Sequence, residues 1–284
     1  MADHSAALRE TAYAKINLAL HVRERMPDGY HRIETLFAFC ADGDVLRAEA
    51  ATDLTLTIDG PFGDALSNGP ENLVLRAADA LRKAVHIETG AALHLTKNLP
   101  LASGVGGGSG DAAAALRILK RLWDPKNDAG ALHQIAADLG ADVPACLLSR
   151  PCFGAGRGDA LTPVAPGNLA GTPILLVNPG VPVETGPVFA AWNGEDGGAL
   201  DMTDPLRLDT DWRNDLAAPA RAIAPAIDKV MAVLEAASGA YFVRMSGSGA
   251  TCFALFDTAG DRDAAAAAIA RDNPEWWTMR SALR

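Results

Sequence analysis

Apolar and polar residues alternate in the first part of the chain. Residues 12–22 place alanine, isoleucine, leucine and valine at every second position, which is typical of a strand with one buried face. A proline and an Asp-Gly pair follow at residues 27–29 and predict a turn. Further strands are expected at residues 33–40, 44–49 and 54–58, so the chain is predicted to begin as a β-meander.

A second periodicity, with apolar residues three or four positions apart, predicts helices. These helices are expected at residues 70–85, 111–123, 129–139 and 142–149. Pro70 is placed to open the first of them. An alternating strand at 91–99 leads into the glycine-rich residues 100–110, and a strand pair interrupted by glycines is expected within 152–164.

The pattern changes at residues 165–172, which are polar and rich in proline and glycine. Such a segment is typical of a domain boundary, and it predicts two domains, residues 1–165 and 166–284. The elements expected after it are a buried strand at 173–177, an irregular segment to about residue 213, two helices between 214 and 238, strands at 241–245 and 251–256, and a final helix. Pattern alone therefore predicts a mixed α/β plan with antiparallel strands.

Composition excludes several classes of protein. The 25 basic and 35 acidic residues give a net charge of −10, which disfavours a nucleic-acid-binding protein. Apolar runs such as residues 173–177 are far shorter than the roughly 20 residues that cross a bilayer, and the first ten residues do not resemble a signal peptide. We therefore expect a soluble cytoplasmic protein with neither membrane nor nucleic-acid partners. The four cysteines form no CxxC pair, so buried reduced thiols are expected.

Glycine is concentrated in residues 100–110, directly before the expected helix at 111–123. A glycine-rich turn that leads into a helix offers backbone N–H groups and the positive end of the helix dipole, so it can hold a phosphate without a lysine. The alternative is a connecting loop without function. The chain has no Gly-Lys pair, which excludes a P-loop, and the spacing of the glycines excludes a dinucleotide-binding loop. Another kind of phosphate loop is predicted.

The segment "PLASGVGGGSGDAAA" resembles the phosphate loop of the GHMP kinases. The blocks "AYAKINLALHV" with "DGYHRIETLF", "LGADVPACL" and "MSGSGATCFALF" also resemble this superfamily, in its order, and together span residues 12–256. The resemblance implies an α+β fold of two domains. The N-terminal one is expected to be ribosomal protein S5 domain 2-like and the C-terminal one ferredoxin-like.

Within the superfamily, the blocks are most similar to kinases whose acceptor contains a cytidine diphosphate moiety. The resemblance implies ATP-dependent phosphorylation of the 2-hydroxyl of 4-diphosphocytidyl-2-C-methyl-D-erythritol in the non-mevalonate isoprenoid route. Another GHMP small-molecule kinase, of the homoserine or mevalonate type, is the first alternative, and a non-catalytic metabolite sensor is the second. A base-stacking tyrosine in "DGYH" argues against the first, and joint retention of Lys15 and Asp142 argues against the second.

Lys15 and Asp142 are the predicted catalytic residues. From the residues alone, Lys15 is ordinarily a solvated strand residue that shares a face with Asn17, and Asp142 is ordinarily a helix cap. The resemblance implies instead that Asp142 takes or orients the proton of the acceptor hydroxyl. Lys15 would then keep that carboxylate ionised and stabilise negative charge on the transferred group.

The resemblance also implies a set of binding residues. Those expected to bind the acceptor are Asn17, Tyr30, His31, Thr185 and Phe189, with the rings of Tyr30 and Phe189 stacked on the cytosine. Those expected to bind ATP are Asn72 and Lys97 near the adenine and, around the phosphates, Pro100, Leu101, Ala102, Ser103, Gly104, Val105, Gly106, Gly107, Gly108, Ser109 and Gly110. ATP chemistry implies Mg²⁺, although no metal ligand is identified.

One position departs from the family loop. Gly110 stands where the family usually has a second hydroxyl residue, next to Ser109. Backbone N–H groups, Ser109 or water are therefore expected to take over what that hydroxyl does.

Overall fold

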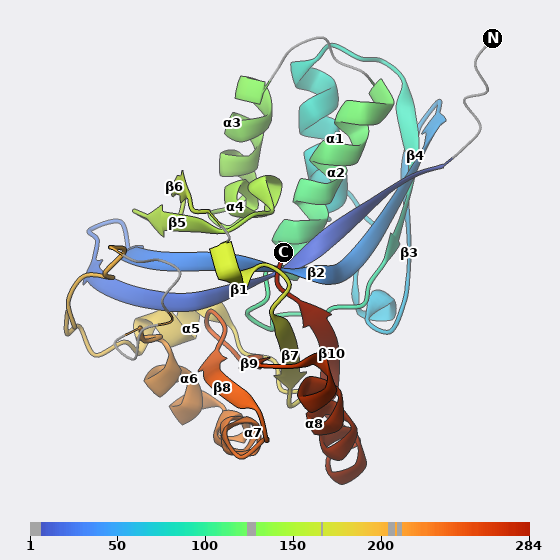
Figure 1. Ribbon diagram of the computed structural model, residues 1–284. Coiled ribbons are helices and arrows are strands. Elements are labelled where there is room, and N and C mark those ends of the chain that lie inside the picture. The colour runs from blue at the N-terminus through green and yellow to red at the C-terminus, as the bar shows by residue number, and fades with distance from the viewer. Residues whose placement is uncertain (1–6, 124–128, 166, 204–207, 209–211) are drawn as a thin grey trace. The chain divides into compact units, whose positions relative to one another are not determined.

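The computed structural model describes residues 7–123, 129–165, 167–203, 208 and 212–284, and Figure 1 shows their order along the chain from blue to red. Contacts divide the chain into two units. Unit 1 comprises Met1–Ala14, Asp42–Leu99 and Gly106–Leu148, and unit 2 comprises Lys15–Ala41, Pro100–Val105 and Ser149–Arg284. The segments of the two units alternate along the sequence. The division into domains at residue 165 stays a prediction.

Two long strands contribute residues to both units. β1 (Leu8–Arg25) pairs with β2 (His31–Ala51). The strand expected at 12–22 is therefore confirmed, and so is the turn that follows it, because a turn within residues 26–30 joins β1 to β2.

The break expected between residues 33–40 and 44–49 is wrong, since both stretches belong to β2. A β-carbon added to Gly43 would lie only 2.0 Å from the carbonyl oxygen of Ala12. Glycine at this position permits a close approach of backbone to backbone. The sequence was interpreted as two separate strands, whereas Gly43 lies within one strand and lets it approach β1 closely.

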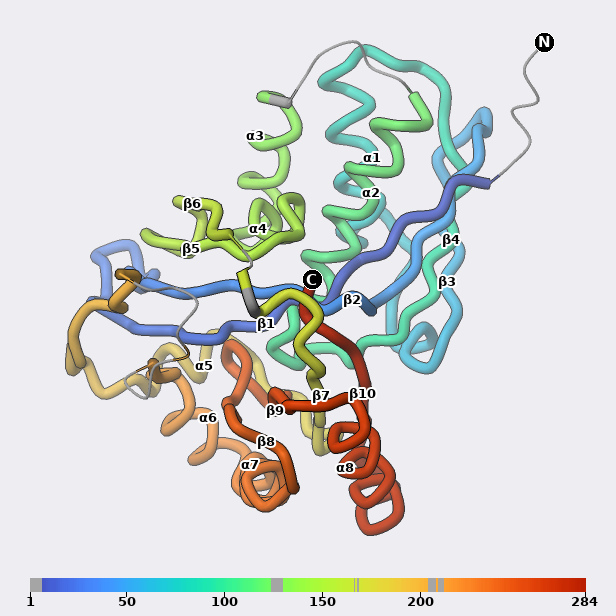
Figure 2. Tube along the Cα trace, in the orientation of Figure 1, coloured from blue at the N-terminus to red at the C-terminus, as the bar shows by residue number. Residues whose placement is uncertain are grey.

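Unit 1 combines a small sheet with helices. β3 (Leu54–Asp59) pairs in parallel with β4 (Gly90–Thr96), and β4 pairs antiparallel with β2. The helices that the structure describes are α1 (Leu73–Ala84), α2 (Gly107–Trp123), α3 (Ala129–Leu139) and α4 (Val143–Leu148), and a 3-10 turn lies at Gly63–Ala65. Figures 1 and 2 show α1 and α2 side by side. Four successive buried alanines, at 112–115, give α2 small side chains on which neighbouring elements can pack closely.

Two helices of unit 1 begin elsewhere than expected. Asn72, not Pro70, precedes the first residue of α1, and its side-chain oxygen accepts the N–H of Val74 at 2.9 Å, which is the usual bond of an N-cap. α2 begins at Gly107, within the glycine run, rather than at residue 111. Glycine has low helix propensity, so local preference alone predicts that the helix begins later, at residue 111.

Unit 2 contains a hairpin and a second sheet. β5 (Cys152–Ala155) pairs with β2 and with β6 (Ala160–Pro163), as the glycine-interrupted strand pair predicts. The second sheet has the order β10–β7–β9–β8 and is antiparallel throughout. Its strands are β7 (Pro173–Asn178), β8 (Ala240–Met245), β9 (Cys252–Phe256) and β10 (Trp277–Ala282). β10 was missed because its side chains are mostly half-buried and show little contrast between apolar and polar positions.

The helices described in unit 2 follow the expected order. α5 (Thr185–Ala190) lies in the segment that was expected to be irregular, and the others are α6 (Ala217–Ile223), α7 (Ala226–Glu235) and α8 (Ala259–Asp272), with a 3-10 turn at Gly167–Leu169. Part of that irregular segment, residues 204–207 and 209–211, lies outside the described residues. A core of apolar side chains includes Val177 from β7, Ile227 from α7 and Cys252 from β9.

Two expectations from composition concern the cysteines and the possibility of a membrane-spanning helix. The four cysteines are free and buried, which confirms the expectation of buried reduced thiols. Among the residues that the structure describes, no helix is long and apolar enough to cross a membrane.

Candidate active site

The glycine loop divides between the two units. Residues 106–110 belong to unit 1 and include the first turn of α2, which begins at Gly107. Gly106 has a φ of 66°, in the left-handed region that favours glycine, and its carbonyl accepts the N–H of Gly110 at 2.7 Å. The N–H groups of a first helical turn precede the regular helix bonds and point outward along the axis. This turn therefore has the backbone arrangement of an anion-binding helix start.

The first half of the loop, residues 100–105, lies in unit 2 and packs against the SGSG turn at 246–249. Ser246 Oγ donates to the carbonyl oxygen of Gly104 at 2.8 Å, and Thr251 N–H donates to that of Ser103 at 3.2 Å. A β-carbon on Gly104 would lie 2.3 Å from the Ser246 carbonyl oxygen, and its φ is 77°. The SGSG turn thus contacts this half of the loop, and the contact explains why glycine is required at position 104.

Lys15 and Asn17 lie beside this half of the loop, also in unit 2. Lys15 N–H donates to the carbonyl oxygen of Val105 at 2.9 Å, and Lys15 Nζ donates to Asn17 Oδ1 at 2.9 Å. Asn17 Nδ2 in turn donates to Thr35 Oγ1 at 2.8 Å, while the Asn17 N–H donates to Ser246 Oγ at 3.3 Å. Lys15 is only 3 % exposed. The shared face is confirmed, and the interpretation of Lys15 as a solvated lysine is wrong.

Asp142 lies in unit 1, immediately before the first residue of α4. Its carbonyl oxygen accepts the N–H of Cys146 at 3.0 Å, so it occupies the position that precedes the helix. Lys15 belongs to unit 2. The pairing of Lys15 with Asp142 therefore stays a prediction.

Two of the residues predicted to bind the acceptor meet in unit 2. The ring centroids of His31 and Phe189 are 5.1 Å apart, and Trp192 stands edge-on to His31 at 5.7 Å. Arg25 Nε donates to His31 Nε2 at 3.2 Å. Burial, and secondly the charge of Arg25, lower the pKa of His31 below its ordinary value, so the imidazole is neutral at pH 7. Trp192 was missed, although its position three residues after Phe189 is helical spacing and could have indicated it.

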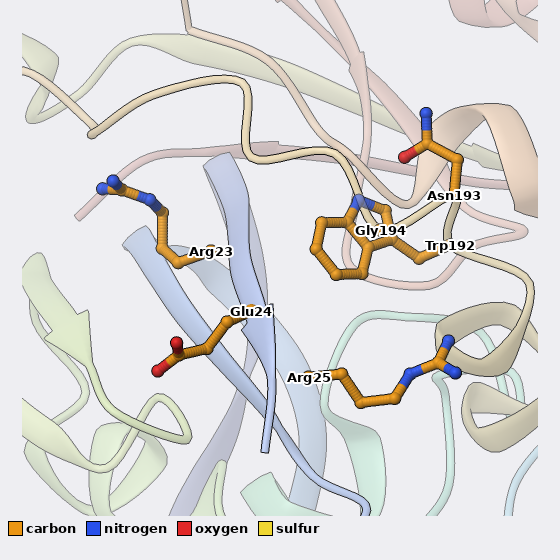
Figure 3. A pocket seen from close by; sticks show the side chains of 6 residues that line it. All are labelled: Arg23, Glu24, Arg25, Trp192, Asn193 and Gly194. Atoms are coloured by element: carbon orange, nitrogen blue, oxygen red, sulfur yellow. The ribbon is translucent and has the colours of Figure 1, made fainter.

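A surface pocket of about 350 Å³ opens beside Trp192 (Figure 3). The residues that line it are Arg23, Glu24, Arg25, Trp192, Asn193 and Gly194. Arg23 is paired with Glu34 and Asp196. For Arg25, which also donates to the Ala190 carbonyl oxygen, no carboxylate partner is found within the described ranges. The pocket therefore combines an aromatic wall with a guanidinium charge.

Tyr30 and Thr185 occupy different places from the ring cluster of His31, Phe189 and Trp192. Tyr30 is 54 % exposed and its ring lies under the guanidinium of Arg157, whose carbon is 4.1 Å from the ring centroid. It does not line the pocket. Thr185 Oγ1 shares a hydrogen bond of 3.0 Å with Ser248 Oγ, in the SGSG turn. Tyr30 and Thr185 thus stay predicted acceptor-binding residues, with Thr185 next to the turn that supports the loop.

Asn72 and Lys97, the residues predicted near the adenine, both lie in unit 1. Asn72 caps α1, and Lys97 is 1 % exposed with its ammonium bonded to Asp44 and Asp111. Burial lowers the pKa of Lys97, but the two carboxylates raise it more, so the net direction is upward. Sequence reasoning missed both carboxylates, because Asp44 and Asp111 are 53 and 14 residues from Lys97 in the sequence. Among the described residues, no group of three or more His, Cys, Asp or Glu is arranged to hold a metal ion.

Two family models match this chain. That of the GHMP kinases N terminal domain matches residues 72–150, and that of the GHMP kinases C terminal matches residues 201–275. The chain belongs to the GHMP kinase family. Its mixed helices and sheets confirm the expected α+β class, and membership of a kinase family implies ATP as the phosphate donor.

Similar proteins span nearly the whole chain. The 4-diphosphocytidyl-2-C-methyl-D-erythritol kinase of Sphingopyxis alaskensis is 51% identical over 99% of this chain and 100% of its own length. The enzyme of the same name from Rhizorhabdus wittichii is 52% identical over 97% of this chain and 94% of its own. A crystal structure of 4-(cytidine 5'-diphospho)-2C-methyl-D-erythritol kinase is 34% identical, with a TM-score of 0.83 over 97% of this chain and 99% of that one.

Proposed function

We propose that this protein transfers the γ-phosphoryl group of ATP to the 2-hydroxyl of 4-diphosphocytidyl-2-C-methyl-D-erythritol, a step in making isoprenoid precursors. The observation that carries the proposal is the identity, of about half of all positions over the full length, to kinases named for this acceptor. The matches cover 97% or more of this chain, so they span the residues proposed to bind the acceptor as well as the nucleotide loop. The product is the 2-phosphate of the acceptor, with ADP released.

The nucleotide would be held by the glycine loop. Phosphoryl transfer needs positioned phosphates and neutralised charge rather than covalent chemistry by the protein. The N–H groups at the start of α2 and the positive end of its dipole supply both. Asn72 and Lys97 are proposed near the adenine, with Lys97, which is buried, as a support. Mg²⁺ would arrive with ATP, since it is usually held by phosphate oxygens with one or two carboxylates.

Lys15 and Asp142 would act on the acceptor hydroxyl. Asp142 takes or orients its proton, which makes the oxygen a better nucleophile. Lys15 is suited to stabilise negative charge, because its ammonium is buried and is oriented by the amide oxygen of Asn17. A charge in a buried site interacts more strongly than one in water.

The cytosine would bind at the cluster of His31, Phe189 and Trp192. This is supported by the rings themselves, which offer flat apolar surfaces for stacking, and by the pocket that opens next to Trp192 (Figure 3). The Arg25 guanidinium at this pocket suits an acceptor that carries a diphosphate. Asn17, Tyr30 and Thr185 remain proposed contacts to polar parts of the acceptor.

A coupled assay of ADP release tests the proposal. ADP should be released with the diphosphocytidyl acceptor and not with mevalonate, homoserine or galactose. Release with mevalonate or homoserine alone would assign another GHMP kinase activity, and release with none of the four would favour a metabolite sensor.

The proposed general base has a test of its own. Asp142→Ala should lower kcat by about 10²- to 10⁴-fold while circular dichroism and Tm stay close to those of the unchanged protein. Asp138→Ala, an exposed position on α3, serves as the matched control. Near-normal turnover by folded Asp142→Ala would refute this role.

A further inference from the structure

Three charged side chains form a buried cluster beside the start of α2. Lys97 Nζ donates to Asp44 Oδ2 at 2.5 Å and to Asp111 Oδ2 at 2.6 Å. The three side chains are 1 %, 0 % and 4 % exposed for Lys97, Asp44 and Asp111, and all three residues belong to unit 1. A β-carbon added to Gly107 would lie 3.0 Å from Lys97 Nζ. The cluster is thus in contact with the first residue of the helix that follows the glycine loop.

The two carboxylates have unequal sets of donors. Asp44 Oδ1 accepts the N–H groups of Asn98 and Leu99, at 2.5 and 2.8 Å, and its Oδ2 accepts Lys97. Asp111 Oδ2 also accepts Lys97, but Asp111 Oδ1 is buried without a hydrogen-bond partner. Within the described ranges it is the one buried side-chain nitrogen or oxygen in this condition. Hydrogen bonds favour the ionised form of a carboxylate, and Asp111 accepts fewer of them than Asp44 does.

The cluster has one negative charge in excess when all three groups are ionised. An excess charge in a buried site is costly, and a protein can avoid it by binding a proton. The unequal donors single out Asp111 as the group that binds it. In agreement, burial raises the pKa of Asp111 to about 7, with Lys97 opposing the rise and Asp44 adding to it.

This proton matters because of where the cluster lies. Asp44 fixes the backbone of Asn98 and Leu99, which lead into the loop, and Asp111 lies in the second turn of α2, which follows it. Lys97 joins the two carboxylates. An ionised Asp111 would add a negative charge under the helix turn that is proposed to hold phosphates, and like charges repel.

We propose that Asp111 is a positioning residue of the nucleotide loop which takes up a proton from solution when ATP binds. The proton adds to Asp111 and no other bond changes. The neutral acid still accepts Lys97 through its other oxygen, so the cluster keeps its geometry and loses its excess charge. The charged groups that face Asp111 are Lys97 at the end of β4 and Asp44 on β2. The inference rests on the proposed binding of ATP phosphates at residues 106–110.

Titration calorimetry of ATP binding in buffers of different ionisation enthalpy measures the proton directly. Near pH 8, about one unit above the Asp111 pKa, ATP binding to the unchanged protein should be accompanied by proton uptake. The number of protons taken up should exceed that of Asp111→Asn by most of one. Near pH 6 this difference should nearly vanish, because Asp111 is already protonated. Asparagine has the shape of the neutral acid and does not titrate. Protonation of ATP itself cancels in the difference.

Affinity gives a second readout. Between about pH 7 and 8 the Kd for ATP should rise by roughly three- to tenfold more in the unchanged protein than in Asp111→Asn. Asp79→Asn, at a half-buried ion pair on α1, is the matched control and should follow the unchanged protein. Equal proton uptake by the unchanged protein and Asp111→Asn would overturn the inference and leave the proposed function intact, whereas an unchanged protein that does not bind ATP refutes the proposed function.

If Asp111→Asn does not fold, infrared spectroscopy of the unchanged protein decides. The carbonyl stretch of a buried protonated carboxyl should be present near pH 6, disappear near pH 9, and return in the alkaline sample on addition of ATP. A spectrum in which ATP restores no such band would overturn the inference.

Discussion

Two buried lysines, one in each unit, differ in the side chains that accept their hydrogen bonds. Lys15 is 3 % exposed and donates to the neutral amide of Asn17, whereas Lys97 is 1 % exposed and donates to two carboxylates. The Asn17 amide, which is neutral, orients the ammonium of Lys15, while the two carboxylates more than neutralise the charge of Lys97. Both lysines adjoin the glycine loop, Lys15 through Val105 and Lys97 at Gly107. Burial of a lysine therefore does not reveal its role, which depends on the charge of its partners.

Removing the ammonium of Lys97 is expected to have the largest effect on stability. Lys97→Met leaves Asp44 and Asp111 buried together, and breaking a buried ion pair typically costs about 3–5 kcal/mol. Carboxylates whose pKa is raised on folding make stability fall as pH rises, so the loss should be greater near pH 8 than near pH 6. Urea unfolding at both pH values measures it. A loss below about 1 kcal/mol would contradict the structural role of Lys97.

Removing the ammonium of Lys15 should affect turnover rather than stability. Lys15→Met is expected to lower kcat by about 10²- to 10³-fold, since buried groups that stabilise developing charge contribute on this scale. The apolar chain of Met retains much of the packing against Phe37, whose ring centroid lies 5.2 Å from Lys15 Nζ. Steady-state kinetics and thermal unfolding separate the two effects. If the loss of kcat relative to the loss of stability is the same in Lys15→Met and Lys97→Met, the contrast between the two lysines is wrong.

The aromatic cluster should contribute to acceptor binding on a smaller scale. Trp192→Leu removes the edge-on contact with His31 and one wall of the pocket. We expect KM for the diphosphocytidyl acceptor to rise about 3- to 10-fold, in line with about 1 kcal/mol for an aromatic contact, while KM for ATP stays unchanged. An equal rise in both KM values would show that the substitution acts on the fold. Trp276→Leu, a half-buried tryptophan that packs against the core, is the control.

The smallest effect is expected at Gly110. A β-carbon there would lie 3.4 Å from the Tyr13 carbonyl oxygen, so serine fits with a small adjustment, and serine is a better helix former than glycine by about 0.5 kcal/mol. KM for ATP should change less than about twofold in Gly110→Ser if backbone N–H groups suffice for the phosphates. A fall of tenfold would mean that the missing hydroxyl limits ATP binding.

Regular elements were predictable wherever their periodicity is strong. The strand at 173–177, the helix at 129–139 and the hairpin partners around SGSG are found close to where the pattern predicts them. Gly43 and Gly107 misled, because glycine indicates a break by local preference. The tertiary structure shows instead that Gly43 lies against the backbone of Ala12 and Gly107 against the side chain of Lys97. β10 pairs with β7 across about a hundred residues of sequence, so no local pattern reveals it.

The sequence by itself determined the family, the order of most elements and the glycine loop, because these depend on residues that are neighbours in the chain. Tertiary structure decided which charges meet. Asp44, Lys97 and Asp111 are far apart in sequence, and so are His31 and Trp192. Burial then raised the pKa of Asp111 and set the rings of His31 and Trp192 edge-on, since desolvation and packing arise only when distant segments fold together.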